Sequence, residues 1–161
     1  MRKVTAALSI FLVILLFASL GVAADKSMSE RIFKASLSGG EEVPFIRTEA
    51  KGEAVLQVGK GGDIVTYKLT LSDIKEVTAA YIQKGKKGEN GPPVIDLFTE
   101  SKQEDVSGTL LAEGKVEPYL LIGPLKGKPL HSLIRLMKAG EVYVNIQTKK
   151  HPDGEIRGQI K

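Results

Sequence analysis

Apolar and polar residues alternate with a period of two in several short segments of the 161-residue chain, as expected for half-buried β-strands. In residues 33–38, Phe33, Ala35 and Leu37 alternate with polar side chains, and a glycine doublet ends the run. Residues 53–74 predict a β-hairpin, because two alternating arms flank the glycine-rich turn GKGGD. Further strand candidates lie at residues 78–83, 92–98, 107–117, 141–148 and 155–160.

One segment has the period of an amphipathic helix. Apolar residues recur at offsets 0, 3, 4 and 7 in residues 130–138, and Gly140 follows at the position of a C-terminal cap. The strand candidate at 107–117 is the weakest, because Gly114 interrupts it. Seven or eight short strands and no long helix predict an all-β fold, an antiparallel, Greek-key-like sandwich or flattened barrel with one short crossover helix. We expect a single domain over residues 25–161.

The first 24 residues have the layout of a secretory signal peptide. Arg2 and Lys3 precede an uncharged apolar stretch, and small residues up to Ala24 form the expected cleavage site. We predict cleavage after Ala24, a mature chain that begins at Asp25, and a secreted or periplasmic location. The alternative is a retained membrane anchor, because 21 uncharged residues approach the ~20 that span a bilayer. The short apolar centre favours removal, so we expect no membrane contact after cleavage.

Composition excludes several functions. The chain has no cysteine, which rules out disulfides, thiol catalysis and cysteine-held metal centres. The net charge of +4 falls to +2 in the mature chain, with 21 basic against 19 acidic residues, and this is too weak for a nucleic-acid-binding surface. His131 and His151 are the only histidines, and neither adjoins a nucleophile motif. We therefore predict no enzyme activity, no cofactor and no metal site.

Two strand candidates present polar side chains on the face opposite the core. These side chains are Tyr81 and Gln83 in the first strand and Tyr143, Asn145 and Gln147 in the second. The loop of residues 84–93 adds Asn90 and needs Gly85, Gly88 and Gly91 to turn. Two interpretations remain open: the ordinary outer face of a sheet, or a hydrogen-bonding ligand site walled by this loop. Under the second interpretation, the residues that contact the ligand are Tyr81, Gln83, Asn90, Asn145 and Gln147.

Four motifs run through essentially the whole mature chain. They are FKASLSGGEEVP, TAAYIQKGKKGENGPPVIDLF, LIGPL and GEVYVNIQTKKHPDGEIRGQI. In this order they resemble the CHRD domain, a chordin-type family found in the animal protein chordin and in many exported bacterial proteins. The resemblance implies an all-β extracellular or periplasmic domain of poorly defined activity, similar in pattern to the copper/zinc superoxide dismutase sandwich.

The family tends to carry histidines where this chain has Tyr81, Gln83 and Gln147. Three such histidines would suit copper or zinc, whereas glutamine amides and a phenol with a pKa of ~10 are poor replacements. The resemblance therefore implies that a metal site at this location is lost. We predict an exported, non-catalytic binding or structural module with an unknown extracellular or envelope partner. The alternative is a metal-binding or dismutase-like redox protein that uses a site elsewhere.

Overall fold

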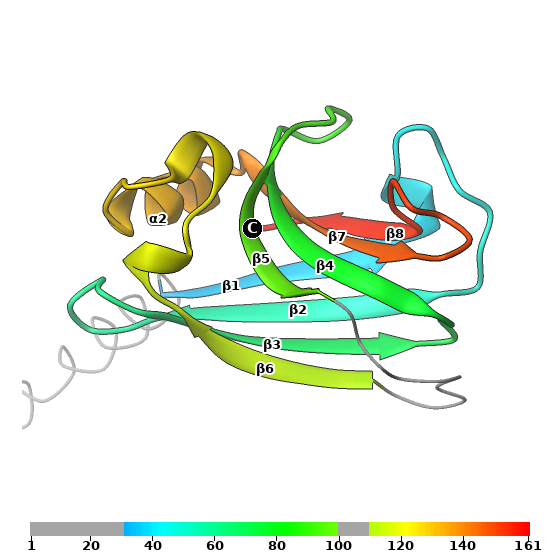
Figure 1. Ribbon diagram of the computed structural model, residues 1–161, viewed down its shortest axis with the longest axis horizontal. Coiled ribbons are helices and arrows are strands. Elements are labelled where there is room, and N and C mark those ends of the chain that lie inside the picture. The colour runs from blue at the N-terminus through cyan, green and yellow to red at the C-terminus, as the bar shows by residue number, and fades with distance from the viewer. Residues whose placement is uncertain (1–30, 100–109) are drawn as a thin grey trace, which may run out of the picture. The chain divides into compact units, whose positions relative to one another are not determined.

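The computed structural model describes residues 31–99 and 110–161, which form one sheet of eight strands and the helix α2 (Figure 1). The strands are β1 (Ile32–Ser38), β2 (Lys51–Val58), β3 (Val65–Ser72), β4 (Val77–Lys84), β5 (Pro93–Thr99), β6 (Leu110–Val116), β7 (Val142–Thr148) and β8 (Ile156–Gln159). The helices are α2 (His131–Ala139) and the short 3-10 turns η1 (Gly39–Glu41), η2 (Pro118–Leu120) and η3 (Gly123–Leu125). The predicted signal peptide lies outside the described residues.

The strands pair antiparallel in the order β5-β4-β7-β8-β1-β2-β3-β6, and the sheet curls until its two ends approach each other. Beyond β6, Leu121 forms a bridge with Ile95 of β5, and the Ile122 N–H donates to the Val94 carbonyl at 2.9 Å. The Tyr67 hydroxyl of β3 donates to a β5 carbonyl at 2.7 Å. The result is a nearly closed, flattened barrel, which confirms the predicted all-β fold class.

Apolar side chains on the inner face of the sheet form the core. In β4, Ala80 and Ile82 have no exposed area, and they lie beside Ile146 and Val144 of β7, which are equally buried. This arrangement confirms the predicted alternation, because successive side chains of a strand point to opposite faces. The neighbours of Ala80 and Ile82 in sequence therefore point away from the core.

Helix α2 is the crossover between β6 and β7 that the sequence period predicts, and it lies over one end of the barrel (Figure 1). Its buried side chains are Leu133, Ile134, Leu136 and Met137. The helix ends at Gly140, whose left-handed backbone (φ 62°, ψ 36°) directs its N–H to the carbonyls of the last turn. Within the described residues, no helix has the length and apolar character needed to cross a membrane.

Gly114 does not interrupt β6, contrary to the sequence prediction. The strand continues through this residue, which is paired with Tyr67 of β3. A Cβ atom at position 114 would lie 2.7 Å from the Tyr67 hydroxyl oxygen, so the glycine leaves room for the tyrosine ring. Glycine at this point accommodates a neighbouring side chain, a role that alternation along one strand does not reveal.

Candidate functional site

Strands β4 and β7 are neighbours, so the two polar rows found in the sequence share one face. Tyr81 is paired with Asn145, and Gln83 is paired with Tyr143. Side chains of directly paired residues lie on the same face of a sheet. Strand β8 continues this face, with Arg157 opposite Asn145. We call this surface the polar face, and its residues are Tyr81, Gln83, Tyr143, Asn145, Gln147, Arg157 and Gln159.

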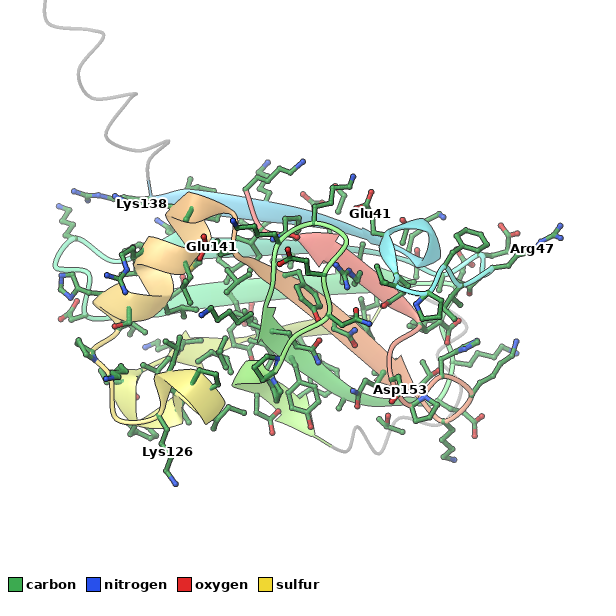
Figure 2. All side chains as sticks on the ribbon, turned by 90° about the horizontal axis from the view of Figure 1, so that it is seen from above. Glu41, Arg47, Lys126, Lys138, Glu141 and Asp153 are labelled. Carbon is green, nitrogen blue, oxygen red and sulfur yellow. The ribbon has the colours of Figure 1, made fainter. Side chains whose placement is uncertain are left out.

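The loop of residues 85–92 folds back over the polar face (Figure 2). The Gly91 N–H donates to the Tyr143 hydroxyl at 3.1 Å, which fixes the end of the loop to β7. Gly88 has a left-handed φ of 83°, and a Cβ atom on Gly91 would lie 1.7 Å from the Lys84 carbonyl oxygen. These two positions therefore require glycine, as the sequence predicts.

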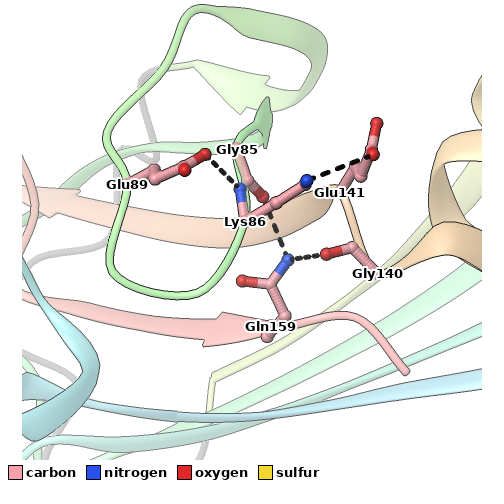
Figure 3. A network of polar contacts seen from close by, with 6 residues as sticks. All are labelled: Gly85, Lys86, Glu89, Gly140, Glu141 and Gln159. Carbon is pink, nitrogen blue, oxygen red and sulfur yellow. Dashed lines mark hydrogen bonds and ion pairs between the residues drawn. The ribbon is translucent and has the colours of Figure 1, made fainter.

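Gln159 fixes the start of the same loop (Figure 3). Its Nε2 lies 3.0 Å from the Gly85 carbonyl oxygen and 2.8 Å from that of Gly140. The Val142 carbonyl is a third acceptor at 2.8 Å. Because an amide nitrogen carries two hydrogens, the three acceptors share them. Gln159 thus joins the loop, the end of α2 and the start of β7, and its nitrogen has no bond left for a ligand.

Arg157 lies at the centre of the polar face and is 2% exposed. Its Nη1 donates to Asn90 Oδ1 at 2.9 Å, and its Nη2 donates to the Glu89 carbonyl at 3.2 Å. The guanidinium carbon lies 4.0 Å from the centre of the Tyr143 ring, in a cation–π contact. Asn90 in turn donates from Nδ2 to the Val43 carbonyl at 2.6 Å. Asn90, a predicted ligand contact, therefore bridges Arg157 to the segment that follows η1.

Gln83 is also held within the protein. The Tyr143 hydroxyl donates to Gln83 Oε1 at 2.5 Å. Burial raises the pKa of the Tyr143 phenol, while the Gly91 N–H and the charge of Arg157 act in the opposite direction. The phenol therefore stays protonated at neutral pH and continues to donate. Gln83, like Asn90, stabilises the arrangement of the face.

A buried carboxyl group, that of Glu42, lies beside Asn145. Asn145 Nδ2 is 3.5 Å from Glu42 Oε1 and 3.4 Å from the Asp153 carbonyl oxygen. Burial raises the pKa of Glu42 to about 7, although the Arg157 charge and a hydrogen bond from the Val43 N–H lower it. Near neutral pH the Glu42 side chain is therefore a mixture of carboxylic acid and carboxylate. Among the described residues, Asn145 Oδ1 is buried and has no hydrogen-bond partner.

Tyr81 and Gln147 are half-buried, and neither side chain makes a hydrogen bond within the described residues. Burial, together with the Asp96 carboxylate, raises the pKa of the Tyr81 phenol, so its hydroxyl is neutral at physiological pH. Gln147 is paired with Ala79 and is a diagonal neighbour of Tyr81. Gln83 lies four residues along β4 from Ala79, or ~13 Å, so one small ligand does not reach both Gln83 and Gln147.

Sequence reasoning missed Arg157 and Glu42, although both are buried side chains that can carry a charge. A signal for Arg157 was present, because Ile156 and Ile160 alternate toward the core and leave Arg157 on the other face. Glu42 follows η1, where no strand period applies. The described part of the chain contains no group of three or more His, Cys, Asp or Glu side chains placed to hold a metal ion.

The curled antiparallel sheet with a loop-covered polar face is an all-β domain. Residues 33–160 match the family model of the CHRD domain, and the chain belongs to this family. The match confirms the family that the four sequence motifs indicate. Searches of curated proteins and of solved structures find no match to this chain.

Proposed function

We propose that this protein is an exported, non-catalytic binding module that contacts its partner through Tyr81 and Gln147. The observation that supports this function is that some polar side chains of the face form hydrogen bonds within the protein and others do not. Gln83, Asn90 and Arg157 are committed to bonds within the protein and hold the strands and the loop together. Tyr81 and Gln147 lie on the same face, and their side chains make no hydrogen bond to any residue that the structure describes.

The chemistry of this pair suits recognition. The hydroxyl of a neutral phenol can both donate and accept a hydrogen bond. A primary amide donates through its nitrogen and accepts through its oxygen. Diagonal positions on paired strands place the two Cβ atoms within ~8 Å, a spacing that an extended polar partner bridges.

The contact role of Tyr81 is testable by photo-cross-linking in the producing cell. Tyr81→p-benzoylphenylalanine should give an adduct of one discrete mass with a component of the cell envelope. Lys68→p-benzoylphenylalanine is the matched control, because Lys68 is exposed on β3 at a position outside the polar face. Adding Gln147→Ala should weaken the adduct formed from position 81. Equal adducts from positions 81 and 68, or none from position 81, would contradict the proposed contact.

Export and the absence of a resident metal are tested together on protein purified from its native host. The intact mass should correspond to a chain that begins at Asp25, as cleavage after Ala24 requires. Elemental analysis of the same sample should find far less than one copper or zinc ion per chain. A retained N-terminus would contradict export through a cleaved signal, and a stoichiometric metal would support the redox alternative instead.

A further inference from the structure

The carboxyl group of Glu42 and the amide group of Asn145 face each other in a place that is shielded from solvent. Asn145 Nδ2 lies 3.5 Å from Glu42 Oε1. A Cβ atom on Gly154 would lie 2.8 Å from Glu42 Oε1 and 3.0 Å from Asn145 Oδ1, so both oxygens border the same small space. Glu42 is 7% exposed and Asn145 is 3% exposed. The two side chains therefore form a buried pair of a carboxyl group and an amide.

The protonation state of Glu42 decides whether the Asn145 amide oxygen has a donor. Asn145 Oδ1 has no other hydrogen-bond partner in the described part of the chain. A carboxylate only accepts hydrogen bonds, whereas a carboxylic acid also carries one O–H donor. A protonated Glu42 can therefore donate to Asn145 Oδ1. Because a buried polar atom without a partner costs free energy, this geometry favours the carboxylic acid over the carboxylate.

The charges around Glu42 do not compensate for its burial. Arg157 acts on Glu42 through its charge, but its guanidinium donates to Asn90 and Glu89, and Glu42 forms no ion pair within the described residues. Burial outweighs this attraction and raises the pKa of Glu42 to about 7. The other titratable groups on the elements packed around Glu42 are Glu41 of η1, Tyr143 of β7, Lys150, His151, Asp153 and Glu155 between β7 and β8, and Lys86, Lys87 and Glu89 of the loop.

A short series of contacts joins Glu42 to the loop of residues 85–92. The carbonyl of Val43, the next residue, accepts a hydrogen bond from Asn90 Nδ2 at 2.6 Å. Asn90 Oδ1 accepts from Arg157 Nη1 at 2.9 Å. A movement that takes the Glu42 carboxyl into solvent shifts the neighbouring Val43 carbonyl and breaks the first of these two bonds. The position of Glu42 is therefore coupled to the closure of the loop.

We propose that Glu42 is a pH switch for the loop of residues 85–92. As a carboxylic acid bonded to Asn145 it keeps the segment of residues 42–46 in place and the loop closed. As a carboxylate it moves into solvent, where its charge is hydrated, and both segments open. Opening uncovers the middle of the polar face at higher pH. The switch does not depend on the partner contacts proposed above.

The test is amide hydrogen exchange of the isotope-labelled mature protein at about pH 5 and about pH 8, with intrinsic rates taken into account. The reporters are the Glu89 and Gly91 amides, which donate to the Lys86 carbonyl and the Tyr143 hydroxyl. Their protection factors should fall at least about tenfold between the two pH values, because the charged form of Glu42 favours the open loop. Glu42→Gln should keep the protection at both, since its amide never ionises.

Low concentrations of urea distinguish an opening of the loop from unfolding of the whole domain. A local opening exposes little surface, so urea should not accelerate exchange of the two loop amides. Amides in the middle of β2, which exchange through global unfolding, should accelerate. His151→Gln removes the histidine that lines the same cavity as Glu42 and should keep the wild-type pH dependence. Glu53→Gln, an exposed position on β2, should keep it as well.

Three results would overturn the proposal. They are equal protection of the loop amides at the two pH values, a fall in Glu42→Gln as large as in the wild type, and acceleration of the loop amides by urea in parallel with β2. The carbon-13 shift of the Glu42 carboxyl gives a further readout that needs no variant. It should titrate with the same midpoint as the loop protection, and a different midpoint would also reject the switch. The experiment contains no partner, so its failure leaves the proposed binding function untouched.

Discussion

Replacing Arg157 by methionine should lower the free energy of unfolding by about 3 kcal/mol, a size typical of breaking a buried charged contact. Methionine keeps an unbranched side chain of similar length but removes the guanidinium group. The variant loses the hydrogen bonds to Asn90 and Glu89 and the contact with the Tyr143 ring. It also leaves the buried Glu42 carboxyl without the nearby positive charge that stabilises its ionised form.

Chemical denaturation of the mature domain measures this loss, and Arg135→Met is the matched control. Arg135 lies on α2 and is exposed, so its replacement should change the stability by less than about 0.5 kcal/mol. Hydrogen exchange gives a second readout, because Arg157→Met should release the amides of residues 85–92 more than those of β2. A loss below about 1 kcal/mol, or uniform exchange, would show that Arg157 does not hold the loop.

The stability of the domain should fall by about 3 kcal/mol between acidic and neutral pH through Glu42 alone. Burial raises the pKa of this carboxyl from 4.5 to about 7 in the folded protein. Because the folded state favours the protonated form, the stabilising contribution is complete below pH 4.5. It decreases as the pH rises and is lost above about 7, where the folded protein must hold a buried carboxylate.

The difference in unfolding free energy between wild type and Glu42→Gln isolates this effect, since the amide does not titrate. Relative to Glu42→Gln, the wild type should lose stability as the pH is raised from 4 to 8 in steps of about 0.5. Glu53→Gln, an exposed position on β2, should follow the wild-type curve. Parallel curves for wild type and Glu42→Gln would show that the carboxyl is not buried in the manner described.

The fold was largely predictable because each strand carries its own alternation. The inward positions of β4 and β7 followed from period two, and α2 followed from apolar residues at helical spacing with a glycine after them. Gly114 was misread because the residue that explains it, Tyr67, lies on another strand. A local pattern shows that a strand lacks a side chain at one position, but it does not show what fills the space.

The candidate site was predictable only in part, because its contacts also join different strands and loops. The polar residues of β4 and β7 were identified from alternation, and their proximity depended on strand pairing, which the structure supplies. The hydrogen bonds that decide which residues remain open join positions far apart in sequence, such as Asn90 with Val43 and with Arg157. No periodic pattern encodes such contacts, so Gln83 and Asn90 seemed equivalent to Tyr81 before the fold was known.

The near closure of the sheet has a consequence for how the folded chain behaves at high concentration. A free strand edge exposes backbone groups that another chain can pair with, and this is a route to aggregation. At β5 the backbone of Val94 and Ile95 is occupied by Ile122 and Leu121 of the same chain. The segment after β6 therefore covers this part of the β5 edge. A strand of a second copy cannot pair with these backbone groups while they are bonded within the chain.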